Sequence, residues 1–283
     1  MPFRFSNVIT SPKYRVRYPV MPRTDPKKPP CPADACIAFE DLTAGYGSHA
    51  AIHHLSGKLE RGTLTAVVGP NGSGKSTLVK CITGLLAPMS GTCRVATDAS
   101  LAYLPQQSEL DRSFPARVVD LVALGLWRER GLLGRHRAED RRAVADALRA
   151  VGLEGFETRP IDSLSGGQLQ RALFARVLVQ DADLILLDEP FNAIDEKTIR
   201  DLIGLILHWH GEGRTVVVVV HDLDLVRAHF PQALLLARRP IAWGSTAEVV
   251  TPDNMRRARQ FQEAWDEKAP WCEPSPAPVR GVA

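Results

Sequence analysis

The chain has 283 residues, of which 45% are hydrophobic, 24% charged and 6% aromatic. These ordinary values predict a globular body with a sizeable core and exclude a chain that is disordered throughout. No apolar run approaches the roughly 18 residues needed to cross a bilayer, and no apolar segment of a secretory signal follows the basic N-terminus. We therefore expect a soluble cytosolic protein.

The net charge of +3 is unevenly distributed. Residues 1–30 contain seven Lys or Arg and one acid, which leaves 28 basic and 31 acidic residues in the remainder. A slightly acidic body gives no electrostatic footprint for nucleic acid, so no nucleic-acid partner is expected for it. Residues 1–36, rich in proline and basic side chains, are expected to form a disordered arm. Contact of this arm with anionic lipid or RNA, and a translation start at Met21, are open alternatives.

The predicted elements alternate between strands and helices. Strands are expected at 37–42, 51–59, 63–68, near 94 and at 101–104, with a helix over 75–86. Residues 116–152 are rich in Leu, Ala and Arg and are expected to be helical. A helix ending near 180, a strand at 184–188, a helix at 195–212 and a strand at 215–220 follow. Continuous apolar strands between helices predict an α/β fold with a parallel sheet covered on both faces.

A glycine-rich loop joins the strand at 63–68 to the next helix. Its residues, Gly69, Pro70, Asn71, Gly72, Ser73, Gly74, Lys75, Ser76 and Thr77, match the pattern G-x-x-x-x-G-K-[ST]. Backbone N–H groups of such a loop surround a β-phosphate, and the positive end of the following helix faces the same anion. We expect Lys75 to reach the β- and γ-phosphates of ATP and the Ser76 hydroxyl to bind Mg²⁺.

Acidic residues end the strand at 184–188. Asp188 is placed at the carboxyl edge of the sheet, where it would hold Mg²⁺ through water. Glu189 is placed to orient and deprotonate the attacking water. His221 follows the next strand and is expected to point at the γ-phosphate, although a histidine at a strand end is commonly structural.

A second anion-binding loop lies between these motifs and carries a family resemblance. It consists of Leu164, Ser165, Gly166, Gly167 and Gln168, in which a serine hydroxyl and glycine N–H groups begin a helix. The segment resembles the signature motif of ABC-type ATPases, and the resemblance of the chain to that family covers about residues 37–250. The resemblance implies a P-loop fold with an antiparallel N-terminal β subdomain and a helical subdomain at about 114–165. It also implies that the signature closes on ATP held by a second subunit.

Three further residues fall in the order of that family. Tyr46 matches the aromatic residue that stacks on adenine, with an ordinary turn tyrosine as the alternative. Gln106 matches the glutamine that senses Mg²⁺ and connects to the helical insertion. Asp195 matches the loop that crosses the dimer interface. Residues 251–283 are expected to form a C-terminal helix and an unstructured tail.

The segments at 106–115 and 118–122 are similar to the zinc and manganese group of these ATPases. The chain departs from that group at Asn192, where many members carry Thr, and lacks a His-rich C-terminal stretch. The resemblance implies a homodimer on the cytoplasmic side of the inner membrane. Its implied partners are integral membrane permease subunits and, indirectly, an extracytoplasmic metal-binding protein.

Other functions stay open at this stage. The resemblance implies the ATP-hydrolysing subunit of an importer for a divalent metal ion, with zinc as the expected cargo and manganese or an iron-siderophore complex as the alternative. A soluble ABC ATPase without a transport function is a distant alternative. A metal sensor is a further alternative, but His53-His54 and His208-Trp209-His210 lack a convincing third ligand. Cys31, Cys36, Cys81, Cys93 and Cys272 are irregularly spaced and are expected to be reduced, non-catalytic thiols.

Overall fold

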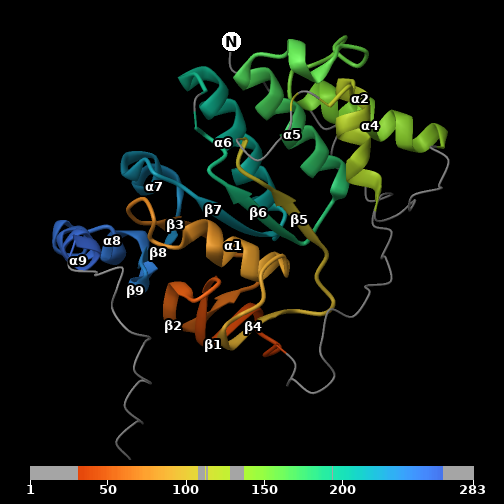
Figure 1. Ribbon diagram of the computed structural model, residues 1–283. Helices are drawn as coiled ribbons and strands as arrows, with labels where there is room; N and C mark the ends of the chain where they lie inside the picture. Colours follow the sequence, from red (N-terminus) through yellow and green to blue (C-terminus); the bar gives the residue numbers. More distant parts are fainter. Residues whose placement is uncertain (1–30, 108–111, 113, 128–136, 193, 264–283) are drawn as a thin grey trace, which may run out of the picture.

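The computed structural model describes residues 31–263 except 108–111, 113, 128–136 and 193. The arm over 1–30, the tail over 264–283, Cys272 and much of the segment at 106–115 therefore lie outside the described residues. The described chain forms two β-sheets and a group of helices to one side of them (Figure 1).

The larger sheet has six strands. Their order is β5 (Leu101–Leu104), β6 (Leu184–Asp188), β7 (Thr215–Val219), β3 (Leu64–Val68), β8 (Gln232–Ala237) and β9 (Arg239–Ser245). All neighbours are parallel except β8 and β9, which pair antiparallel. β3, β6 and β7 are buried along their whole length, because helices or the second sheet cover both of their faces.

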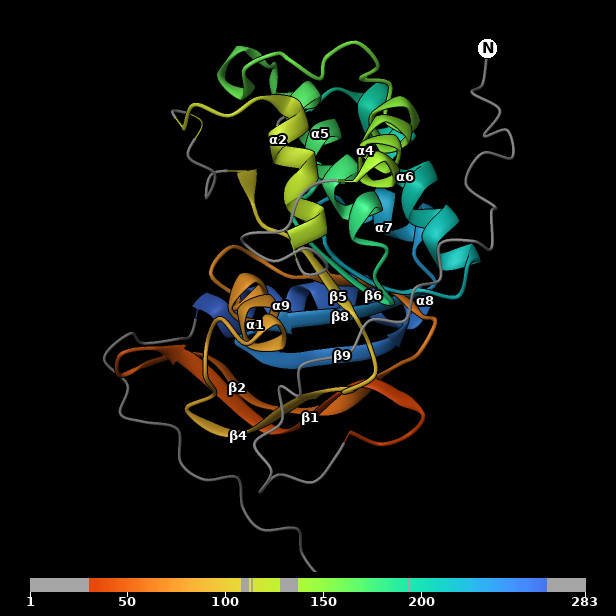
Figure 2. The ribbon, with the colours of Figure 1, turned by 90° about the vertical axis from the view of Figure 1, so that its right-hand side faces the viewer.

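The smaller sheet is antiparallel, in the order β2 (His49–Glu60), β1 (Ala35–Tyr46) and β4 (Ser90–Val95). Helix α1 (Lys75–Thr83) lies between the two sheets (Figure 2). Its Leu78 and Ile82 share one apolar cluster with Ile37 of the small sheet and Leu186 of the large one. The mainly parallel core, the antiparallel subdomain and the helical insertion agree with the fold class expected from the sequence.

The remaining helices cover the other face and the ends of the large sheet. They are α2 (Val118–Ala123), η3 (Leu124–Leu126), α4 (Ala138–Ala150), η4 (Ile161–Ser163), α5 (Gly166–Gln180), α6 (Glu196–Gly211), α7 (Leu223–His229), α8 (Thr246–Val249) and α9 (Pro252–Glu263). Side chains of α2, α4, α5 and α6 join one continuous core with those of the sheet. No helix in the described ranges is both long and apolar enough to span a bilayer.

Several element boundaries differ from the sequence-based expectation, and α7, β8, β9 and α8 were not expected from the sequence. Two of the boundaries have a clear structural reason. β1 begins at Ala35, two residues before the predicted strand, because Ala35 pairs with Glu60 of β2. α1 ends at Thr83 and does not reach Leu86. Gly84 caps it in the left-handed conformation (φ 75°), which a glycine adopts without steric cost and which stops the helix.

Candidate active site

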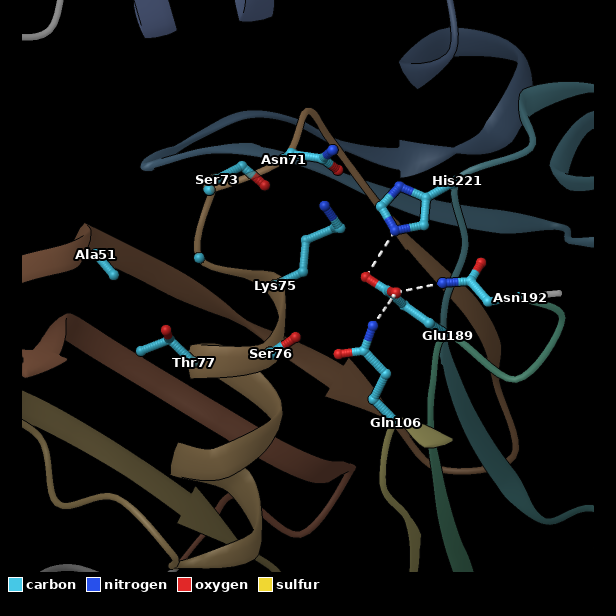
Figure 3. A pocket seen from close by; sticks show the side chains of 12 residues that line it. Ala51, Asn71, Ser73, Lys75, Ser76, Thr77, Gln106, Glu189, Asn192 and His221 are labelled. Atoms are coloured by element: carbon cyan, nitrogen blue, oxygen red, sulfur yellow. Dashed lines mark hydrogen bonds and ion pairs between the residues drawn. The ribbon is translucent and has the colours of Figure 1, made fainter. Parts of the chain in front are cut away.

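A cavity of about 610 Å³ opens beside the N-terminus of α1. It is lined by the loop residues Asn71, Gly72, Ser73, Gly74, Lys75, Ser76 and Thr77, by Ala51, and by Gln106, Glu189, Asn192 and His221. Figure 3 shows the loop on one side of the cavity and the group around Glu189 on the other. Apart from Ala51 of β2, these residues follow the ends of β3, β5, β6 and β7, so the parallel sheet brings them together at its carboxyl edge.

The loop adopts a conformation that depends on glycine. Gly74, which precedes α1, has φ 97°, and a Cβ atom there would lie 2.6 Å from the carbonyl oxygen of Ala51. Lys75 is buried, and its Nζ donates to the carbonyl oxygens of Gly69 and Pro70 at 2.9 Å each. Burial lowers the pKa of Lys75, and the nearby Glu189 and Asp188 carboxylates oppose that shift. The loop thus holds a buried cation beside the N-terminus of α1.

The lower part of the cavity has ligand chemistry that suits magnesium. The hydroxyl of Ser76 donates to Oδ1 of Asp188 at 3.3 Å, which brings two of the three expected Mg²⁺ ligands together. Gln106, the third, lines the cavity with Ser76, whereas Asp188 is buried and does not line it. Hydroxyl, carboxylate and amide oxygens are the hard ligands that Mg²⁺ prefers. These residues therefore fit a hydrated magnesium ion, which would neutralise phosphate charge when bound.

Glu189 is the centre of a hydrogen-bonded group of side chains. Its Oε2 accepts from Nε2 of Gln106 at 2.7 Å and also from Nδ2 of Asn192. Its Oε1 lies 2.6 Å from Nε2 of His221. Glu189 itself has φ 50°, a left-handed conformation that is strained for a glutamate and that is common at functional sites. The predicted base, the glutamine and the histidine are therefore in direct contact (Figure 3).

The signature segment lies outside this cavity. Ser165 caps α5: its Oγ accepts from the N–H of Gln168, and the Gln168 side chain accepts from the Ser165 N–H. Leu164 is buried below the loop. Neither these residues nor Gly166 and Gly167 line the cavity with Lys75. The signature residues are therefore separate from the cavity that contains Lys75 in the same chain.

Asp195 and Tyr46 also lie outside the cavity lining. Asp195 caps α6 and accepts from the Thr198 backbone N–H at 2.9 Å and from the Thr198 hydroxyl at 2.8 Å. These hydrogen bonds, the backbone one above all, lower the pKa of Asp195. Tyr46 is 53% exposed at the end of β1 and its ring is open to stacking.

Two polar contacts at or near the cavity were not expected from the sequence. Asn192 was singled out only as a departure from the metal-transport group, but it lines the cavity and contacts Glu189. Gln107 received no role, but its Nε2 donates to the Gly166 carbonyl oxygen and to Oε1 of Gln170. The signal available for Asn192 was its position three residues after the predicted base, within reach of a tight turn.

No cluster of three or more His, Cys, Asp or Glu side chains within the described ranges is placed to hold a metal ion. His54 instead contacts Asp41, at 2.7 Å between Nδ1 and Oδ1, and His208 lies near Glu212 of its own helix. Burial lowers the pKa of His53, which favours its neutral form. His54 and His208 thus each lie beside a carboxylate of the same chain.

Comparison with known proteins places this geometry in a family. The family model described as ABC transporter matches residues 52–192. A probable metal transport system ATP-binding protein of Chlamydia pneumoniae is 42% identical over 224 residues, covering 77% of this chain and 86% of the relative. The chain belongs to the ABC transporter family. As a member of this family, it is an ATPase.

Two other relatives carry names for particular metals. The manganese transport system ATP-binding protein MntA of Synechocystis sp. is 40% identical, with 77% of this chain and 88% of the relative covered. The zinc transport system ATP-binding protein TroB of Treponema pallidum is 38% identical, with 78% and 86% covered.

Solved structures of ABC proteins have the same fold. An ABC transporter described as of the metal-chelate type, in an inward-facing conformation, superposes with a TM-score of 0.72 at 29% identity over 80% of this chain and 89% of its own. The dimeric structure of the bacterial ABC transporter cassette MJ0796 gives a TM-score of 0.66 at 26% identity, with 74% and 98% covered.

Proposed function

We propose that this chain is the ATP-hydrolysing subunit of an importer for a divalent metal ion, with zinc as the first candidate cargo. The observation that carries the proposal is that its relatives, similar over most of both chains, are named for metal transport. Manganese is the second candidate, because several relatives carry that name. The similarity to a metal-chelate type transporter keeps an iron-siderophore cargo as a third.

In the proposed reaction, the loop at 69–77 binds the phosphates of ATP and Lys75 contacts the β- and γ-phosphates. Glu189 takes a proton from the attacking water, and His221 contacts the γ-phosphate. Ser76, Gln106 and Asp188 would hold Mg²⁺. Tyr46 would stack on adenine, for which its exposure leaves room.

The proposed active assembly is a homodimer in a head-to-tail C2 arrangement. The signature at 164–168 does not line the cavity that contains Lys75 and Glu189, so one chain holds both halves of a site in two separate places. Two-fold symmetry pairs each cavity with the partner's signature and gives two equivalent ATP sites. Asp195, at the start of α6, would lie at the interface.

The proposed partners are membrane permease subunits, with an extracytoplasmic metal-binding protein acting through them. The chain would be a peripheral protein at the cytoplasmic face of the inner membrane. Its helical subdomain exposes large apolar side chains: Phe114 is 66% exposed, Leu124 46% and Trp127 53%. Leu124 and Trp127 are three residues apart in one helical turn and share a face, which suits contact with a permease helix.

Glu189→Gln tests the hydrolytic mechanism. The amide keeps the shape of the side chain but cannot take a proton, so ATP binding and dimerisation should persist while hydrolysis falls at least about 100-fold. Size-exclusion chromatography with ATP and a phosphate-release assay measure the two properties. Hydrolysis at the wild-type rate would refute the assignment of Glu189 as the base.

Cellular metal content tests the cargo. Zn, Mn and Fe are measured by elemental mass spectrometry under metal limitation, in a deletion strain carrying either the wild-type gene or Lys75→Ala. Selective loss of one metal in the variant strain would identify the cargo. No change in any metal, with the wild-type protein expressed and active as an ATPase, would refute metal import and favour a non-transport ABC ATPase.

A further inference from the structure

We propose that Asn192 is a positioning residue for Glu189, which holds the Oε2 oxygen of the base so that Oε1 faces the attacking water. Asn192 donates its side-chain amide Nδ2 to Oε2 of Glu189. Both residues line the ATP cavity, and Figure 3 shows the Asn192 amide pointing at the carboxylate from the side opposite Lys75.

The Glu189 carboxylate has three side-chain partners, and two of them are expected to act elsewhere during the reaction. Gln106 shares Oε2 with Asn192, at 2.7 Å, and His221 contacts Oε1 at 2.6 Å. Gln106 is an expected Mg²⁺ ligand and His221 an expected contact of the γ-phosphate. Asn192 is not expected to bind Mg²⁺ or phosphate. It can therefore keep its hydrogen bond to Glu189 while Gln106 and His221 move away from the carboxylate.

The backbone places Asn192 independently of the helical subdomain. Its N–H donates to the carbonyl oxygen of Glu189 at 3.4 Å, which closes a turn over Glu189, Pro190, Phe191 and Asn192. Phe191 packs against the main core and anchors this turn. Gln106, in contrast, belongs to the segment that leads into the helical subdomain. A shift of that subdomain would therefore move Gln106 relative to the base and leave Asn192 in place.

The chemistry of the amide suits this role. A neutral N–H donor fixes the direction of a carboxylate oxygen without adding a positive charge beside it. Hydrogen bonds to a charged group are worth about 1.5–3 kcal/mol, which corresponds to about 10-fold to 100-fold in a rate when the bond orients the base. The Glu189 side chain is only 12% exposed, so the direction of its carboxylate depends mainly on its side-chain partners.

Steady-state ATP hydrolysis by the full chain tests this proposal. Asn192→Ala should lower kcat about 10-fold and leave KM for ATP within about twofold, because the amide acts on the base and not on ATP. Asn192→Asp should lower kcat further, since a carboxylate cannot donate and repels Glu189. Asn192→Ser, which keeps a shorter donor, should recover part of the loss.

A double-mutant cycle separates positioning from folding. In the Glu189→Gln background there is no base to orient, so adding Asn192→Ala should change the residual rate less than twofold. Binding of a fluorescent ATP analogue without Mg²⁺ should be unchanged by the two neutral substitutions, Asn192→Ala and Asn192→Ser, which shows that the cavity is still folded. A wild-type kcat for Asn192→Ala, or an equal loss of rate in both backgrounds, would overturn the proposal.

Discussion

The side chain of Gln107 donates a hydrogen bond to the carbonyl oxygen of Gly166, the first residue of the signature helix α5, at 3.0 Å. The same amide also donates to Oε1 of Gln170, which is 2% exposed, at 2.7 Å. The neighbouring Gln106 contacts Glu189. Two adjacent glutamines thus connect Glu189 in the ATP cavity with the start of the signature helix.

The first prediction concerns this connection. Gln107→Leu leaves the Gly166 carbonyl and the buried Gln170 side chain without this donor, so the free energy of unfolding should fall by about 1–3 kcal/mol. ATPase activity should fall as well, because the signature loses a contact that places it. Urea denaturation and phosphate release measure the two effects. Gln260→Leu, at an exposed position of α9, is the control and should change neither.

The second prediction concerns Lys75. Its Nζ is held by the Gly69 and Pro70 carbonyl oxygens and lies in the cavity opposite Glu189. If it pairs with the phosphates, Lys75→Ala removes one partner of a desolvated charge pair, a loss of about 2–5 kcal/mol that weakens ATP binding by about 30-fold or more. Calorimetric titration with ATP measures this. Lys197→Ala, on the exposed side of α6, should bind ATP as the wild type does; unchanged affinity of Lys75→Ala would contradict the proposed role.

The third prediction concerns the shape of the phosphate loop. Gly74→Ala places a Cβ atom 2.6 Å from the Ala51 carbonyl oxygen at a φ of 97°, so the loop or β2 must shift. We expect a loss of about 1–3 kcal/mol in stability and weaker ATP binding. Gly211→Ala is the matched control: its Cβ would meet nothing within 4 Å, at the end of α6, and alanine favours the helix. Equal melting temperatures for the two variants would disprove this prediction.

The fourth prediction concerns pH. Burial raises the pKa of the Cys81 thiol to about 11, above its ordinary value of 9.0. Above pH 9 the unfolded chain releases this proton more readily than the folded chain, so the free energy of unfolding should fall between about pH 9 and pH 11. Below pH 9 this thiol should contribute no slope.

Comparison with Cys81→Ala isolates the effect of that thiol, because all other titrating groups remain. Urea denaturation at pH 8 and pH 10.5 should give a smaller pH-dependent loss for the variant than for the wild type. Identical losses in the two proteins would show that Cys81 does not ionise differently on unfolding.

Local patterns were enough to predict much of the fold. The apolar runs at 184–188 and 215–220 gave strands β6 and β7 almost to the residue, because buried parallel strands need continuous apolar side chains. The loop at 69–77 was found from glycine spacing and its flanking strand and helix. The end of α1 was missed because Leu86 continues the apolar periodicity, whereas Gly84 stops the helix through its backbone.

Spacing and periodicity along the chain were enough to predict many of the elements, the phosphate loop and the chemical types of the residues around it. Which side chains meet depends on how these elements pack in three dimensions. The tertiary structure joined Gln106, Asn192 and His221 on one carboxylate, connected Gln107 to Gly166, and left the signature outside the cavity. The contacts of Gln106, Gln107 and His221 join residues from separate elements, so the packing of those elements fixes them and no local pattern could reveal them, whereas the Asn192 contact lies within one turn.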